Sequence, residues 1–149
     1  MFFPLGIVAC LPGVWPWVAF RMGWTDSFSG IGHGLLQIQG FEMAFVAGFS
    51  MTALPRFLET RPSTGWEFGL ALFFLTTTVF GLYTDDWMTA EWSAALLSGL
   101  LLYFSVSRYV SRKDDPPTEF ALIPCGLCFA LAGALLVLYP VDGFVKLGQ

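Results

Sequence analysis

The chain has 149 residues, of which 56% are hydrophobic and only 12% carry a charge. About a quarter of the residues in a soluble domain are charged. This chain therefore has more apolar surface than one small core can bury, and lipid must be its second solvent. The net charge of −4 is spread along the chain, without the basic patch that a nucleic-acid partner requires. We expect the lipid bilayer as a partner and no nucleic acid.

Five apolar segments are long enough to cross a membrane as helices. A spanning helix needs about 20 mostly apolar residues, and its backbone groups must form hydrogen bonds within the segment. The alternation of a β-barrel strand is missing. The sequence predicts an all-α, polytopic transmembrane helix bundle with short loops, forming a single domain over residues 1–149. The predicted spans are about 2–20, 32–55, 66–83, 91–107 and 119–141.

The first predicted span resembles a membrane helix rather than a signal peptide. Basic residues do not precede its apolar run, and it has no small-residue cleavage site. Pro12 and Pro16 lie one turn apart, and a proline inside a helix removes a backbone hydrogen bond. We expect a kink in this helix.

The basic residues predict an orientation, because short cytoplasmic loops are rich in Lys and Arg. One side of the predicted bundle has Arg21 and Lys146, together with the acidic pair Asp85 and Asp86. The richer, opposite side is predicted to be cytoplasmic, which places the N-terminus inside, in a bacterial inner (cytoplasmic) membrane. The residues of that side are Arg56, Arg61, Arg108, Arg112 and Lys113. Tryptophans favour the interface, and those expected on the outer side are Trp15, Trp17, Trp24, Trp87 and Trp92.

The second predicted span carries the chain's only histidine, His33. A neutral imidazole can ligate a metal, including haem iron, and Gln37, one turn deeper, can bind the same ligand or orient the ring. The small residues that follow allow a helix or a flat cofactor to approach closely. A contact between helices, with His33 bonded to water or a carbonyl, is the alternative. At 100° per residue, one stripe contains His33, Gln37, Gly40, Ala44, Ala47, Gly48 and Met51.

The opposite face of the same span carries Glu42, near its middle. An unpaired carboxylate is costly in hydrocarbon, so we expect Glu42 to be protonated or hydrogen-bonded to a neighbouring helix or subunit. Gln39, three residues earlier, is its predicted partner. Two roles are open, a proton relay and a polar contact between helices, and the second is favoured.

Other chemical motifs are weak. Cys125 and Cys128 form a CxxC, but a zinc site needs four ligands, and a redox pair needs access and a lowered pKa. The sequence lacks a P-loop, a GxSxG and an HExxH. We predict no catalytic residue and do not assign an enzyme activity.

Residues 32–57, GHGLLQIQGFEMAFVAGFSMTALPRF, resemble the second span of the NnrS family, membrane proteins linked to haem, copper and the nitric-oxide response. The triplet His33, Gln37 and Gly40 also resembles small relatives of haem–copper oxidase catalytic subunits. The family usually has a second histidine and an acid shortly after the first, where this chain has Leu35 and Leu36. Family members are longer, and this chain matches their N-terminal part. The residues that match the family pattern are His33, Gly40, Phe41, Gly48, Phe49, Thr52, Ala53 and Pro55.

The resemblance implies a haem-associated protein of respiratory or nitric-oxide metabolism, with His33 as metal ligand and Gln37 and Gly40 in the cofactor-binding set. One histidine cannot supply both ligands of a low-spin haem, so such a haem is five-coordinate or shares a ligand with another subunit. The alternative is a non-catalytic, structural accessory subunit of a larger respiratory or photosynthetic complex, in contact with other transmembrane subunits. A small transporter coupled through Glu42 is a weaker alternative, because no inverted repeat is visible.

Overall fold

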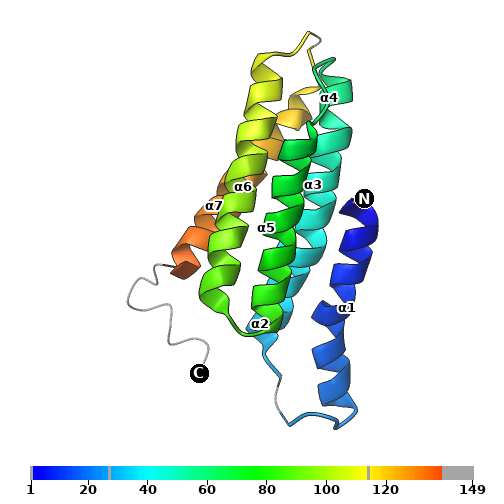
Figure 1. The fold of residues 1–149 in the computed structure, drawn as a ribbon, viewed down its shortest axis with the longest axis vertical. Coiled ribbons are helices and arrows are strands. Elements are labelled where there is room, and N and C mark those ends of the chain that lie inside the picture. Colours follow the sequence, from blue (N-terminus) through cyan, green and yellow to red (C-terminus); the bar gives the residue numbers. More distant parts are fainter. Residues whose placement is uncertain (1, 27, 114, 139–149) are drawn as a thin grey trace.

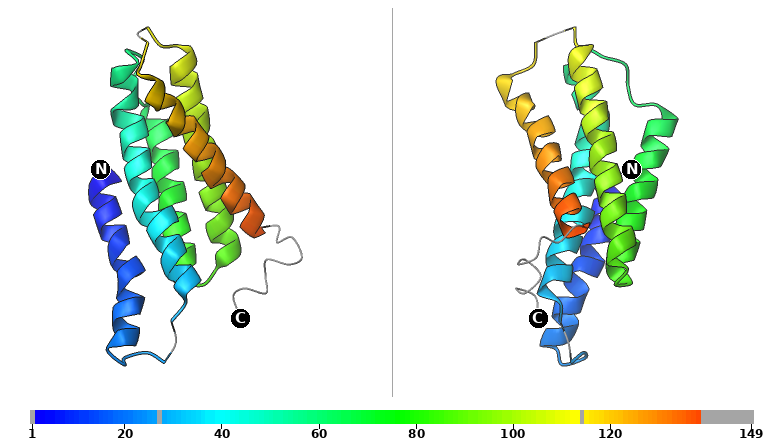
Figure 2. Two further views of the ribbon diagram at one scale, coloured as in Figure 1. Left: turned by 180° about the vertical axis from the view of Figure 1, so that it is seen from behind. Right: turned by 90° about the vertical axis from the view of Figure 1, so that its left-hand side faces the viewer.

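The computed structural model describes residues 2–26, 28–113 and 115–138. Within these ranges all regular elements are helices and none is a strand, so the predicted all-α class is confirmed. Figures 1 and 2 show an elongated bundle. The elements are α1 (Phe2–Arg21), α2 (Gly30–Leu35), the π-helix η1 (Leu36–Glu42), α3 (Met43–Thr52), α4 (Leu54–Phe57), α5 (Gly65–Tyr83), α6 (Trp87–Val110), the 3-10 helix η2 (Thr118–Ala121) and α7 (Leu122–Leu138).

The helices α2, η1 and α3 follow one another without a break and form one long helical segment from residue 30 to residue 52. Its start is fixed by Ser29, whose hydroxyl oxygen accepts a 3.0 Å hydrogen bond from the Gly32 backbone N–H. In its middle, η1 widens the turn; π-helical turns are rare and frequently lie at functional sites. This segment packs against α1 on one side and against α5 and α6 on the other.

Among the residues that the structure describes, three helical stretches are long and apolar enough to cross a membrane: Gly65–Tyr83, Trp87–Val110 and Thr118–Leu138. The predicted count of five is not established, because α1 is apolar over a shorter stretch, Gly6–Arg21, and the second segment changes helix type at η1. The fourth predicted span, about 91–107, is longer at both ends in the structure. The end of the fifth, residues 139–141, lies outside the described residues.

The turn between α5 and α6 explains the early start of α6. Asp86 caps the helix by accepting a 3.2 Å hydrogen bond from the Thr89 N–H. Hydrogen bonds from the side chain and backbone of Thr89 hold the pKa of the Asp86 carboxyl below its usual value. Asp85 has a positive φ of 59°, a conformation that Asp tolerates better than most residues. Directly inside the turn, Gly81 lies against the backbone of Ala90.

The core is formed by α3, α5, α6 and α7, and α7 runs obliquely across the face of the bundle (Figure 2). Much of the outer surface is apolar, as expected for helices that face lipid; Phe73, Phe80 and Phe129 are each at least 60% exposed. The buried apolar residues of the core are Met43, Ala44, Ala47, Met51, Ala71, Leu75, Leu97, Leu101, Phe104 and Leu127.

The two loops predicted to lie on the cytoplasmic side meet at one end of the bundle, at the top of Figure 1. The Lys113 backbone N–H, after α6, donates a 3.1 Å hydrogen bond to the carbonyl oxygen of Leu58, after α4. The Nε of Arg108 donates to the Arg61 carbonyl at 3.1 Å. Five basic residues are therefore gathered at this end, whereas Asp85 and Asp86 lie in the turn at the opposite end.

Candidate functional site

His33 and α1 are joined by a hydrogen bond between a side chain and a backbone carbonyl. The His33 Nδ1 lies 2.6 Å from the carbonyl oxygen of Gly13. A carbonyl can only accept, so Nδ1 carries the proton, and in the neutral ring the lone pair is on Nε2. The ring is half-buried, and the centroid of the Phe28 ring lies 5.8 Å from its own. Metal-binding histidines characteristically donate their other ring N–H to a carbonyl or carboxylate in this way.

Gln37 packs over the same point of α1. A Cβ built on Gly13 would lie 2.6 Å from the Gln37 Nε2, so only a glycine allows the amide to sit there. Seven residues earlier, a Cβ on Gly6 would lie 2.8 Å from the Phe45 ring and 3.2 Å from the Ala44 Cβ. Two glycines of α1 thus allow close approach to the second segment, as small residues do between membrane helices.

The structure shows which way the small-residue stripe of the second segment faces. Its outer half, with His33, Gln37 and Ala44, contacts α1. Its inner half continues into the core, where Ala47 and Met51 are buried. The stripe therefore faces helices of its own fold over the described residues, and Gly40, within η1, is buried with it. Whether His33, Gln37 and Gly40 hold a cofactor stays a prediction.

The predicted pairing of Gln39 with Glu42 is wrong. The Gln39 Nε2 donates a 2.9 Å hydrogen bond to the Oε2 of Glu91, on α6. Gln39 and Glu42 both lie in η1, where the wider π-helical turn alters the angle between positions three apart from that of an α-helix. Gln39 consequently faces the inside of the bundle, and Glu42 is exposed on its outside.

Glu42 lines an apolar groove of about 510 Å³ between the second segment and α7. Phe45, Val46 and Leu122 are among its neighbours in this groove. The two roles predicted for Glu42, proton relay and polar contact between helices, stay predictions.

A second buried polar group lies at the basic end of the bundle. Arg108 is 2% exposed, and its Nη2 lies 3.1 Å from both carboxylate oxygens of Glu67. Glu67 belongs to the capping box of α5, in which it also accepts a 2.7 Å hydrogen bond from the Thr64 N–H. The guanidinium carbon lies 4.2 Å from the centroid of the Phe104 ring. One carboxylate thus caps α5 and neutralises a buried cation of α6.

Sequence reasoning missed both Glu91 and the Arg108–Glu67 pair. Each of these residues lies within about two turns of a helix end, where a charged side chain ordinarily reaches water. The available signal was weak: Thr64 followed three residues later by Glu67 is the capping-box pattern. The burial of Arg108 and Glu91 depends on neighbouring helices, which the sequence pattern does not position.

The metal-ligating residue types are scattered in the structure. Among the described residues, no group of three or more His, Cys, Asp or Glu side chains could hold a metal ion together. Cys125 and Cys128 are free thiols on the exposed side of α7. The hydrogen bond to the Gly13 carbonyl uses Nδ1 of His33, so Nε2 is the ring nitrogen whose chemistry fits a single imidazole ligand to a metal. The chemistry around His33 does not fit a metal centre built from several ligands of the described chain.

Comparison with known proteins gives one match. The model of a protein family described as NnrS protein matches residues 1–146. No curated protein matches the chain, and no solved structure does. The resemblance to relatives of haem–copper oxidase subunits stays a prediction. Because the family model covers nearly the whole sequence, from the first turn of α1 past the end of α7, this chain belongs to the NnrS family.

Proposed function

We propose that this chain is an integral membrane protein of nitric-oxide-linked respiratory metabolism that carries haem on His33. Family membership supports the metabolic assignment. The observation that carries the haem assignment is the hydrogen bond from His33 Nδ1 to the Gly13 carbonyl, because it leaves Nε2 as the nitrogen with a free lone pair. A bound haem supplies an iron centre that can bind a diatomic gas or exchange an electron.

The residues around His33 act on the ring in distinct ways. The Gly13 carbonyl holds the proton on Nδ1 and raises the basicity of the ligating nitrogen. The Gln37 amide, packed on Gly13, offers hydrogen-bonding groups one turn deeper. Any further ligand to the haem would come from another subunit.

We further propose that the basic end of the bundle is cytoplasmic and that the membrane is the bacterial inner membrane. The gathering of Arg56, Arg61, Arg108, Arg112 and Lys113 at one end supports this orientation. In this proposed orientation the N-terminus is inside and His33 lies near the outer surface, where a gas or an extracytoplasmic partner can reach it.

Replacing His33 by asparagine is expected to abolish haem binding and leave the fold intact. The Asn side-chain N–H₂ can donate to the Gly13 carbonyl in place of Nδ1, but Asn has no counterpart of Nε2. The wild-type chain, purified in detergent with haem supplied, is expected to show a Soret band that His33→Asn lacks. In the absence of haem, the two proteins are expected to unfold at the same temperature, because haem binding would otherwise stabilise the wild type alone.

His33→Gly with added imidazole is the matched test of the ligand itself. Free imidazole can occupy the vacated space and is expected to restore the Soret band. A wild-type chain without a Soret band, or a band that survives in His33→Asn, contradicts the haem assignment.

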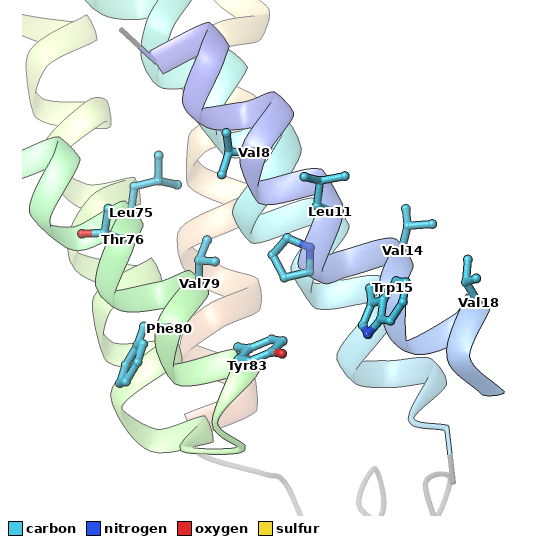
Figure 3. A pocket seen from close by; sticks show the side chains of 11 residues that line it. Val8, Leu11, Val14, Trp15, Val18, Leu75, Thr76, Val79, Phe80 and Tyr83 are labelled. Carbon is cyan, nitrogen blue, oxygen red and sulfur yellow. The ribbon is translucent and has the colours of Figure 1, made fainter. Parts of the chain in front are cut away.

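A second candidate function is that of a structural accessory subunit in a larger respiratory or photosynthetic complex. The observation that favours it is an apolar groove of about 850 Å³ between α1 and α5, open to the outside of the bundle. Figure 3 shows Val8, Leu11 and Trp15 of α1 on one side and Val79 and Tyr83 of α5 on the other. Such a groove can receive a helix of a neighbouring subunit.

Extraction of native membranes in a mild detergent tests this role. An accessory subunit is expected to migrate with other transmembrane subunits in a native gel, and Val79→Trp, which fills the groove, is expected to release it. The exposed residue Phe73, on the same helix but outside the groove lining, provides the control Phe73→Trp. Migration of the wild-type chain alone contradicts the accessory role.

A further inference from the structure

Gln39 and Glu91 form a buried polar pair that the haem proposal does not use. Gln39 is 9% exposed and Glu91 is 1% exposed. A 2.9 Å hydrogen bond from Gln39 Nε2 to Glu91 Oε2 joins them. The remaining oxygens, Gln39 Oε1 and Glu91 Oε1, are buried and have no hydrogen-bond partner among the described residues.

Both atoms without partners are oxygens, so each of them lacks a hydrogen-bond donor. An amide oxygen and a carboxylate oxygen are acceptors only, and a buried acceptor without a donor costs about 1–3 kcal/mol. A proton on Glu91 Oε1 turns that oxygen into a donor. It can then donate to Gln39 Oε1, while Gln39 Nε2 donates back to Glu91 Oε2. One proton satisfies both oxygens at once.

The surroundings disfavour an ionised Glu91. Among the described residues its side chain is hydrogen-bonded to the neutral amide of Gln39, and no ion pair there involves Glu91. A buried carboxylate without a cation is expensive, particularly at membrane depth. The five basic residues gathered near the loops lie at the other end of the bundle.

A cavity gives the pair room for water. A space of about 280 Å³ lies between η1, α6 and α7, lined by Gln39 and Ser98 together with apolar side chains such as Leu97 and Phe129. A cavity needs a volume of at least about 10–15 Å³ to hold one water molecule, and the water needs two or more polar partners. The amide of Gln39 and the hydroxyl of Ser98 offer such partners, so the cavity can hold water next to Gln39, whereas Glu91 is not among the residues that line it.

We propose that the Gln39–Glu91 pair is a proton-binding site inside the helix bundle. Glu91 takes one proton from a hydronium ion, which is left as water, and no electron is transferred. The neutral carboxylic acid donates from Oε1 to Gln39 Oε1. The π-helical turn of η1 matters to the site, because it is the part of the second segment that presents Gln39 to α6. This site is independent of haem at His33.

Infrared spectroscopy of the full chain in lipid at neutral pH tests the proposal. The measurement is made in a Glu42→Gln background, because Glu42 is the other carboxyl expected to be protonated in the membrane. This protein is expected to show the C=O stretching band of a protonated carboxyl group, and adding Glu91→Gln is expected to abolish it. The introduced amide can pair with the amide of Gln39, so this variant is expected to fold. Glu119→Gln, at an exposed position of η2, is the matched control and is expected to keep the band.

Two further measurements examine the hydrogen bond and the access to water. Gln39→Leu removes the partner and is expected to shift the band to higher frequency without abolishing it. Transfer of the Glu42→Gln protein into D₂O is expected to shift the band within minutes, as the proton exchanges through the cavity. A Glu42→Gln protein without the band, a band that persists when Glu91→Gln is added to Glu42→Gln, or a band that does not shift in D₂O over hours overturns the proposal.

Discussion

Replacing Glu67 by alanine is expected to lower the free energy of unfolding by about 3–5 kcal/mol, the range for removing one partner of a buried ion pair. The variant leaves the Arg108 guanidinium, 2% exposed, without the carboxylate that lies 3.1 Å from it. It also breaks the capping box at the start of α5, because the Thr64 N–H loses its acceptor. Reversible unfolding in mixed micelles, followed by circular dichroism, measures the change.

Arg108→Met is the informative counterpart of Glu67→Ala. Methionine keeps an apolar stem against Phe104, and Glu67 retains its Thr64 hydrogen bonds and the nearby Arg61, 3.5 Å away. The decrease in the free energy of unfolding is therefore expected to be smaller for Arg108→Met than for Glu67→Ala. In the double variant the buried charge is absent, so it is expected to be more stable than Glu67→Ala alone. A buried ion pair is contradicted if the two single variants lose equal amounts of unfolding free energy and the double variant loses the sum of the two.

Gly81→Ala is expected to destabilise the bundle by about 1–2 kcal/mol. Alanine gains about 0.5–1 kcal/mol over glycine inside a helix, but overpacking costs about 1–3 kcal/mol. The new Cβ would lie 3.0 Å from the backbone nitrogen of Ala90 and 3.1 Å from the carbonyl oxygen of Asp86. These are backbone atoms at the cap of α6, which cannot move aside as a flexible side chain does. Reversible unfolding in mixed micelles measures the sign and the size of this change in stability.

Gly69→Ala is the matched control, because Gly69 lies in the same helix and a Cβ there meets nothing within 4 Å. The same substitution is therefore expected to stabilise the protein at position 69 and to destabilise it at position 81. If both substitutions change the free energy of unfolding with the same sign, helix propensity, rather than the close approach of α5 and α6, determines the effect.

The helices could be predicted from the sequence because their signals are local. Length and apolar composition predicted helices near 66–83 and 119–141, and the structure has them at Gly65–Tyr83 and Thr118–Leu138. The 100° spacing predicted the stripe headed by His33, and its residues are at least partly buried in the bundle. Helix ends were less well predicted, as α6 shows, since caps such as Asp86 are formed by turn geometry.

The π-helix η1 was not predicted, and its effects reach the candidate sites. The predicted pairing of Gln39 with Glu42 depends on the geometry of a regular α-helix. The wider turn gave Gln39 a different neighbour, Glu91, which lies 52 residues later in the chain. A hydrogen bond between residues so far apart requires two helices in a fixed register, and hydropathy does not determine that register.

The sequence by itself determined that this chain is a helical membrane protein, that His33 heads a stripe of small residues, and that basic residues are concentrated in two loops. Each of these depends on composition or on spacing within one segment. Only the tertiary structure decided that the stripe faces α1 and the core, that Arg108 neutralises Glu67, and that Gln39 meets Glu91. The physical reason is that a buried polar group is stabilised by a partner on another helix, and a one-dimensional pattern does not contain that partner's position.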